Sequence, residues 1–274
     1  MDTMATHGTP HSATATSTMT EPGAVASLGT ILSVWAHPDD ETYLAGGLMA
    51  AARANGQRVS CASATAGERG TSEPDVWPPH RLGMVRRWEA SAAMAILGVT
   101  EHAVAALPDG SLAAHDAAGV EWVRGLVTEV RPDTIVTFGP DGQTFHPDHV
   151  AVHRWVTQVW DEGGRRPRLL CAATTCEHIE RYGDLYEEWG VFMTEERPSG
   201  VPSSHLAVDL RLHGPLLDQK LAALRAMATQ TAPAQSLLGP DLYSAMSSIE
   251  TFVDAAPATL TGTSATRSGP GRSR

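Results

Sequence analysis

The chain contains 274 residues, with 31 acidic against 20 basic side chains and a formal net charge of −11 at pH 7. Apolar residues make up 42% and charged residues 19%, as in globular proteins, and three cysteines are too few for a disulfide framework. The acidic balance argues against a nucleic acid or an anionic membrane as partner, because both are bound by clusters of Lys and Arg.

Both ends of the chain differ in composition from its middle. Ser, Thr, Ala and Gly dominate 1–28, and 255–274 is similarly polar, so we predict a disordered leader and a disordered tail. The first basic residue is Arg53, which leaves the leader without the charged region of a targeting peptide. Since no run of about 18 apolar residues exists, we expect one cytoplasmic domain over 29–254 and no transmembrane segment.

Short strands and helices alternate between residues 30 and 175. Apolar, β-branched runs predict strands at 30–36, 58–65, 102–107, 134–138 and 169–175. The segments between them are predicted helices at 42–55, 82–97, 120–130 and 150–160. This alternation predicts an α/β fold, a Rossmann-like and mostly parallel sheet with helices on both faces.

The sequence after residue 175 is less regular. Residues 177–204 have a weak pattern, and we predict a long loop or excursion that covers the substrate, with burial in the core as the alternative. The aromatic side chains of this segment are Tyr182, Tyr186, Trp189 and Phe192. A further strand at 205–210 and a final amphipathic helix at 216–229 complete the predicted domain.

Two polar loops follow predicted strands. The sequence AHPDDE at 36–41 follows the first strand, and FHPDH at 145–149 follows the fourth. In open α/β sheets, ligands bind beyond the carboxyl ends of the strands, where the strand order reverses. If the order is 3-2-1-4-5, the first and fourth strands are neighbours at that point, and the two loops face each other.

The residue types in these loops are those of a metal site. Two histidines and one carboxylate form a ligand set that leaves a coordination position open for water, as catalytic sites require. His37 and Asp40 are three residues apart and can converge around the turn begun by Pro38. His146 and His149 have the same spacing, so one can bind metal while the other faces the substrate.

Together, the two motifs resemble the LmbE/PIG-L family of zinc-dependent deacetylases, which remove N-acetyl groups from glucosaminyl compounds. The resemblance covers residues 30–160 and does not extend beyond 175. Three shorter features also match: Gly67-Glu68-Arg69-Gly70, the pair Arg86 and Glu89, and Pro108-Asp109-Gly110. The resemblance implies a metal bound by His37, Asp40 and His149, expected to be Zn²⁺, with Fe²⁺ accepted by the same ligand types.

The resemblance also implies catalytic roles. Asp39 is the general base that deprotonates the attacking water, which explains two adjacent aspartates, one binding metal and one accepting the proton. His146 stabilises the oxyanion or protonates the leaving amine, and Asp148 orients it. The expected contacts to the sugar hydroxyls are Glu68, Arg86 and Asp109. The chain departs from the family pattern at Thr144, where some members carry a tyrosine that contacts the transition state.

Simpler interpretations exist for several of these residues. Asp39 and Asp40 can serve only as caps of the helix that follows them, since Asp is a favoured N-cap residue. His153 lies four residues after His149 on a predicted helix, so these two form a rival ligand pair. Arg86 can be a solvated helix residue, and Glu41 is expected to support the site through hydrogen bonds rather than to react.

Other functional classes fit the sequence less well. A Rossmann-type nucleotide binder is disfavoured because AHPDDE at 36–41 replaces the glycine-rich loop, and acidic groups there repel pyrophosphate. A 2-His-1-carboxylate iron oxygenase shares the ligand set but usually has an all-β fold. A non-catalytic module that binds sugar through a metal bridge remains open, although such a module gains nothing from Asp39.

The sequence also bears on the substrate, a small-molecule glycoconjugate. The aromatic segment and Trp77 suggest a wide, partly apolar binding face, and the Arg-rich, Lys-poor composition is typical of a high-GC actinobacterial source. We therefore expect deacetylation of an N-acetylglucosaminyl antibiotic precursor, specifically a glycopeptide pseudoaglycone of the teicoplanin type. The alternative is a mycothiol-pathway N-acetylglucosaminyl-inositol deacetylase or amidase.

Overall fold

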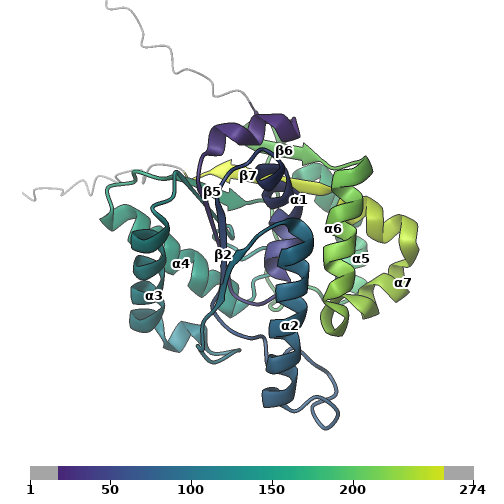
Figure 1. Cartoon of the computed structure of the whole chain (residues 1–274). Coiled ribbons are helices and arrows are strands. Elements are labelled where there is room, and N and C mark those ends of the chain that lie inside the picture. Colours follow the sequence, from purple (N-terminus) through teal and green to yellow (C-terminus); the bar gives the residue numbers. More distant parts are fainter. Residues whose placement is uncertain (1–17, 256–274) are drawn as a thin grey trace, which may run out of the picture.

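A computed structural model describes residues 18–255 of the chain (Figure 1). Its centre is one seven-stranded sheet in the order β3-β2-β1-β4-β5-β7-β6. The strands are β1 (Ile31–Trp35), β2 (Val59–Ser63), β3 (Glu101–Val104), β4 (Thr134–Thr137), β5 (Arg168–Ala172), β6 (Val208–Arg211) and β7 (Ile249–Asp254). The first five strands pair in parallel, and β7 is antiparallel to both of its neighbours. The predicted α/β class and the order 3-2-1-4-5 are therefore confirmed.

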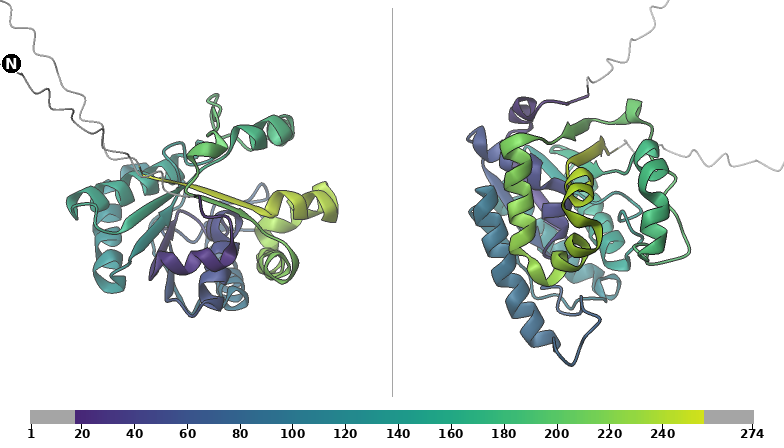
Figure 2. Two further views of the ribbon diagram at one scale, coloured as in Figure 1. Left: turned by 90° about the horizontal axis from the view of Figure 1, so that it is seen from above. Right: turned by 90° about the vertical axis from the view of Figure 1, so that its right-hand side faces the viewer.

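Helices cover both faces of the sheet (Figures 1 and 2). The α-helices are α1 (Asp40–Ala54), α2 (Pro79–Leu97), α3 (Asp116–Val130), α4 (Pro147–Glu162), α5 (Cys176–Glu188), α6 (Gly214–Ala226) and α7 (Ala228–Ser247). Helices α1, α2 and α6 pack together on one side, and α3 and α4 pack together on the other. Among the residues described, no helix has the length and apolar character needed to cross a membrane.

The C-terminal part differs from the prediction in three elements. Residues 176–188 form α5 and not a loop, because apolar side chains recur at helical spacing and Thr175 caps the helix by accepting from the His178 amide at 3.1 Å. The structure also contains α7 and β7, neither of which is predicted from the sequence. Helix α7 includes Pro233 and Pro240, residues that normally break a helical pattern.

The predicted leader over 1–28 is too long at its C-terminal end. Residues 22–28 form the 3₁₀ helix η1 (Pro22–Leu28), in which Val25 and Leu28 are buried in the core. Met19 bridges to Val208 at the edge of the sheet. The rest of the predicted leader, 1–17, and the predicted tail from 256 onward lie outside the described residues.

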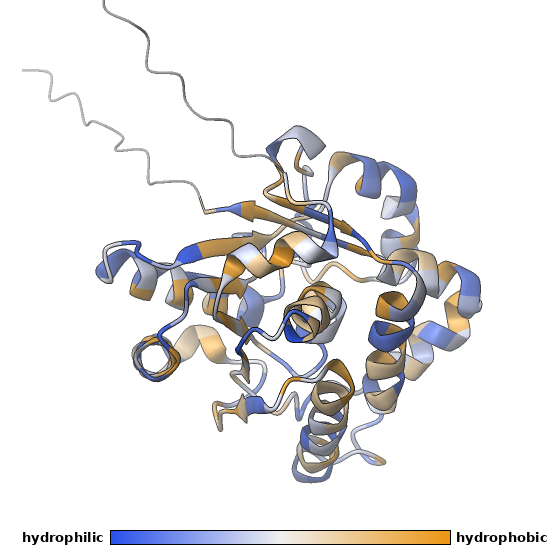
Figure 3. Cartoon of the chain, turned by 45° about the horizontal axis from the view of Figure 1, so that its top comes forward, coloured by the Kyte–Doolittle hydropathy of each residue, from blue (hydrophilic) through white to orange (hydrophobic). Residues whose placement is uncertain are grey.

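The sheet and its covering helices enclose an apolar core, visible in Figure 3 as hydrophobic residues along the strands. All five residues of β1 are buried, as expected for a central parallel strand covered on both faces. Trp35, at the end of β1, meets the edge of Phe138 just after β4, with ring centroids 4.9 Å apart. The core therefore extends to the carboxyl ends of β1 and β4, from which both polar loops leave.

A buried ion pair joins α1 to two later elements. Lys220 on α6 and Glu250 on β7 have fully buried side chains, and Lys220 Nζ lies 2.7 Å from Glu250 Oε1. Lys220 Nζ also donates to the Tyr43 carbonyl at 2.8 Å, and the Glu250 carboxylate accepts from the amides of Gly47 and Leu48, each at 2.7 Å. The pair thus satisfies backbone groups in the middle of α1.

Replacing Lys220 with methionine should destabilise the fold by about 3–5 kcal/mol, because the Glu250 carboxylate stays buried without its counter-charge. Urea denaturation measures this free energy. The exposed pair of Arg58 and Glu101 provides the control, since Arg58→Ala removes a solvated ion pair and should change stability little. An equal, small effect of both substitutions would show that the buried pair does not hold α1.

Candidate active site

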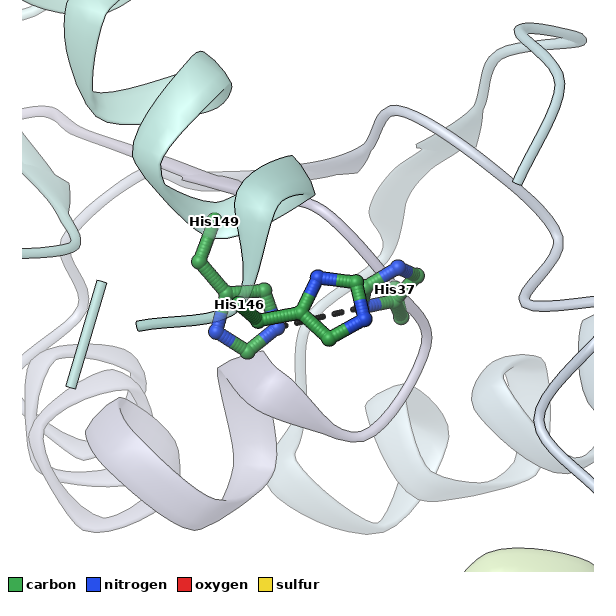
Figure 4. Close-up of side chains that lie close together, drawn as sticks. All are labelled: His37, His146 and His149. Atoms are coloured by element: carbon green, nitrogen blue, oxygen red, sulfur yellow. Dashed lines mark hydrogen bonds between the residues drawn. The ribbon is translucent and has the colours of Figure 1, made fainter. Parts of the chain in front are cut away.

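The two polar loops meet at one edge of the sheet. β1 pairs directly with β4, so the loops that leave their carboxyl ends are adjacent although about a hundred residues separate them in sequence. Helix α1 begins at Asp40 in the first loop, and α4 begins at Pro147 in the second. Figure 4 shows His37 from the first loop beside His146 and His149 from the second. The predicted juxtaposition is present.

Three side chains, His37, Asp40 and His149 (the trio), bring potential ligand atoms 3.2–3.4 Å apart, and Asp40 faces the two histidines with different oxygens. His37 Nδ1 lies 3.2 Å from His149 Nε2 and 3.4 Å from Asp40 Oδ2. The other Asp40 oxygen lies 3.3 Å from His149 Nε2. A tetrahedral ion with bonds of about 2.0–2.2 Å has ligand–ligand edges of about 3.3–3.6 Å. The donor set therefore fits Zn²⁺, and by its chemistry also Fe²⁺.

The remaining nitrogen of each ligand histidine is held by the protein. His37 Nε2 lies 3.0 Å from Asp109 Oδ1 and 3.4 Å from Asp148 Oδ2, and His149 Nδ1 lies 2.9 Å from the Gly142 carbonyl oxygen. Such contacts fix the ring orientation and the tautomer of metal-binding histidines. With protons on these nitrogens, His37 Nδ1 and His149 Nε2 keep their lone pairs for an ion.

The charges around the trio favour an ionised Asp40 and a neutral His149, whereas His37 holds a proton. Although burial opposes it, the neighbouring His149 and His37 hold the pKa of Asp40 well below its usual range. Burial lowers the pKa of His149 to about 4, which leaves this ring neutral and able to bind a cation. In spite of burial, contacts with the carboxylates of Asp109, Asp148 and Asp40 raise the pKa of His37 well above its usual value, so this ring must lose a proton when a cation binds.

Asp39 is adjacent to the trio but is not part of it. Its backbone has a φ of 124°, a conformation that non-glycine residues rarely adopt and that often occurs at functional sites. Glu41 supports this turn as predicted, since its buried carboxylate accepts from the Asp39 amide at 3.0 Å. The Asp39 side chain makes no capping hydrogen bond, so the interpretation of Asp39 as a helix cap is wrong.

The electrostatic environment of Asp39 suits a group that gains and loses a proton. Burial raises the pKa of its carboxyl to about 6, in spite of the Arg86 guanidinium 3.3 Å from Oδ1. A general base works best with a pKa near the working pH. Asp39 thus lies beside the trio and has the basicity that a general base needs near neutral pH.

Asp148 does not orient His146 as predicted. Its carboxylate accepts from the amides of Gly110 at 2.7 Å and Leu112 at 2.9 Å, and it faces His37 instead. It is His146 Nδ1 that accepts from the backbone amide of Asp148, at 3.1 Å, as the N-cap of α4. This arrangement leaves His146 Nε2 available, and the ring is only partly buried.

Two of the three side chains expected to contact the sugar instead bond to other groups of the protein. Arg86 is only 3% exposed, and its guanidinium donates to the carbonyl oxygens of Gly67 at 2.6 Å and Pro38 at 2.5 Å. Asp109 is buried between His37 and the Arg69 amide, which donates to it at 2.7 Å. The predictions of Arg86 and Asp109 as substrate contacts are therefore wrong. Both side chains instead hold the surrounding loops together through these contacts. The contact of Glu68 with the sugar stays a prediction.

The rival ligand pair of His149 and His153 is also excluded by geometry. His153 Nδ1 lies 2.8 Å from the Phe138 carbonyl oxygen, one helical turn further along α4. Within residues 18–255, no cluster of potential ligand atoms includes His153. His146 does offer a ring nitrogen within 4.8 Å of those of His37 and His149, which places it next to any bound ion.

A pocket of about 390 Å³ opens beside the trio, and Asp40 and His149 form part of its wall. Thr144, which replaces the tyrosine of some family members, also lines it. Most of the other lining side chains are apolar or aromatic, among them Leu44, Tyr186, Trp189, Val191, Leu238 and Met246. The predicted excursion at 177–204 therefore contributes to this wall through α5 and the loop after it.

Two tyrosines that line the pocket, Tyr43 and Tyr243, are not among the site residues predicted from the sequence. Tyr43 follows Asp40 by three residues on α1, a spacing that places both on one helix face and could have drawn attention to it. Tyr243 lies on α7, for which no helix was predicted, so no local signal connects it with the site.

Comparison with known proteins identifies a deacetylase family. Residues 32–160 match the PIG-L family, described as GlcNAc-PI de-N-acetylase. A 1D-myo-inositol 2-acetamido-2-deoxy-alpha-D-glucopyranoside deacetylase from Rhodococcus opacus is 32% identical over 244 residues, which cover 75% of this chain and 83% of the relative. A protein of the same description from Saccharomonospora viridis is 31% identical, over 78% of this chain and 87% of the relative.

Solved structures share the fold. The pseudoaglycone deacetylase Dbv21 aligns with a TM-score of 0.61 at 20% identity, covering 84% of this chain and all of that chain. A zinc-inhibited form of teicoplanin deacetylase Orf2 aligns with a TM-score of 0.57 at 18% identity, covering 78% of this chain and 89% of that chain. At such low identity, these similarities extend to the architecture alone.

Proposed function

Because the chain belongs to the PIG-L family of de-N-acetylases, we propose that it is a metal-dependent hydrolase of the acetamide in an N-acetylglucosaminyl conjugate. The observation that carries this proposal is the cluster of donor atoms from His37, Asp40 and His149, 3.2–3.4 Å apart, with the carboxylate of Asp39 close enough to respond to the charges of Asp40 and His37. A sugar-binding module that used the metal only as a bridge would need the trio but not Asp39.

The residues divide the reaction between them. A bound Zn²⁺ or Fe²⁺ would make water more acidic and polarise the acyl oxygen. Asp39 accepts the proton of the water whose oxygen attacks the acyl carbon, and Arg86 and Glu41 hold Asp39 in place. His146, whose Nδ1 accepts from a backbone amide, carries its proton on Nε2 and donates a hydrogen bond from there to the developing oxyanion. The proton that Asp39 has accepted passes to the nitrogen as the carbon–nitrogen bond breaks. Acetate and a free amine leave, and each proton transfer contributes about 10²–10⁴ in rate.

For the substrate, we propose first an N-acetylglucosaminyl-inositol, because the relatives from Rhodococcus opacus and Saccharomonospora viridis are described as deacetylases of that compound. The pocket supports a second candidate. Its apolar wall suits an N-acetylglucosaminyl conjugate with a large apolar aglycone, such as a glycopeptide-antibiotic precursor, better than it suits a polyol.

A substrate panel tests the reaction and separates the two candidates. We expect the purified protein, after its metal content is measured, to release acetate from N-acetylglucosaminyl-inositol and to lose this activity when a chelator removes the metal. Aryl glycosides of N-acetylglucosamine with increasingly large aglycones complete the panel. A higher kcat/KM for these than for the inositol conjugate would select the second candidate. No acetate from any conjugate, with metal bound, would contradict the proposed function.

A further inference from the structure

Tyr43 is placed at the boundary between the metal-type trio and the apolar pocket. It lies one turn after Asp40 on α1, and it lines the same pocket as Asp40 and His149. In a helix, the Cα–Cβ bond tilts toward the N-terminus, so the Tyr43 side chain leans toward the turn that carries Asp39 and Asp40. Its phenol is therefore directed to the end of the pocket where the reaction would occur.

The hydroxyl of Tyr43 is oriented by a second tyrosine. Tyr243 Oη lies 3.1 Å from Tyr43 Oη, with the rings edge to face at a centroid separation of 6.4 Å. Two hydroxyls that bond to each other use one proton, and the second proton remains available. Within the described residues, the Tyr43 hydroxyl makes no hydrogen bond other than this one. The pair thus offers a donor to whatever occupies the pocket.

The backbone of Tyr43 is held as firmly as its hydroxyl. Lys220 Nζ donates to the Tyr43 carbonyl, and Glu250 accepts from the amide of Gly47, one turn further along α1. Three separate elements, α6, β7 and α7, therefore fix the position of one phenol. Such preorganisation is typical of a group that contacts a ligand, and packing alone would be served equally by phenylalanine.

We propose that Tyr43, oriented by Tyr243, donates a hydrogen bond to a hydroxyl of the glucosaminyl ring and thereby selects the substrate, an inference that rests on the proposed function. The sugar needs a hydrogen-bonding side chain on this side of the trio, since Arg86 and Asp109 bond to backbone groups of the protein. In a mostly apolar pocket, a few polar groups fix the orientation of the ligand.

The test compares wild type with Tyr43→Phe, Tyr243→Phe and Thr128→Val on N-acetylglucosaminides that each lack one ring hydroxyl. Tyr43→Phe should raise KM by about 10-fold, as for the loss of one hydrogen bond of about 1.4 kcal/mol, with kcat and metal content unchanged. Tyr243→Phe should raise KM less, since the Tyr43 hydroxyl remains. Thr128→Val removes an exposed hydroxyl on α3, outside the pocket lining, so it should leave both constants unchanged.

One monodeoxy sugar identifies the contacted hydroxyl. Wild type should discriminate against that analogue by about 10-fold, and Tyr43→Phe should treat it and the parent sugar alike. Equal KM values for wild type and Tyr43→Phe would overturn the proposal, as would a loss confined to kcat. If the metal-loaded wild type releases no acetate from any conjugate, the proposed function fails and this role fails with it. An active wild type with an equally active Tyr43→Phe refutes the tyrosine role alone.

Discussion

Replacing Asp39 with alanine should lower the rate of acetate release by about 10²–10⁴-fold and leave the metal content of the protein unchanged. The carboxylate lies beside the trio without belonging to it, so its removal takes away a proton acceptor and no ligand. Elemental analysis of the purified variant, together with steady-state kinetics, measures both quantities. The loss should fall on kcat, since Asp39 acts on the water and not on the sugar.

Asp161→Ala provides the matched control for Asp39→Ala. Asp161 is an exposed carboxylate on α4 that pairs with Arg165, so its loss removes the same charge far from the trio. We expect wild-type kinetics from this control. An Asp39→Ala protein with full activity would overturn the proposed mechanism, and one that loses its metal would make Asp39 a ligand.

Replacing His37 with alanine should reduce bound metal from about one equivalent to a small fraction and abolish activity, because only two of three protein ligands remain. His153→Ala is the matched control, since it removes a histidine whose ring contacts the Phe138 carbonyl and not the trio. The control should keep its metal. Unchanged metal content in His37→Ala, or metal loss in His153→Ala, would refute the ligand assignment.

The sequence predicts the architecture and the meeting of the two polar loops because both depend on local patterns, whereas the choice of His37, Asp40 and His149 as the trio rests on the family resemblance. Alternating strands and helices imply a parallel sheet, and a switch point between the first and fourth strands brings 36–41 and 145–149 together. The chemistry of His37, Asp40 and His149 is then restricted by their residue types. These inferences need no knowledge of side-chain directions.

The predictions that are wrong depend on the directions of side chains and on contacts between residues far apart in the sequence. Asp148 belongs to the same short motif as His146, yet its carboxylate turns to the amides of Gly110 and Leu112, which are far away in sequence. Arg86 has the spacing of a helix residue that can face a ligand, but three groups from two loops surround its guanidinium. Helix α7 was missed because Gly239, with a φ of 69°, and two prolines interrupt it.

The position of β7 has a consequence for the order in which the molecule assembles. Among residues 18–255, β7 is the last strand along the chain, but in space it lies between β5 and β6. During synthesis, β1 to β5 can pair as they emerge, whereas β6 has no neighbouring strand until β7 has been made. Glu250 arrives with β7, so α1 receives the partner for its central amides only at that stage. We therefore expect the pairing that completes the sheet and the contact that secures α1 to form together, late in folding.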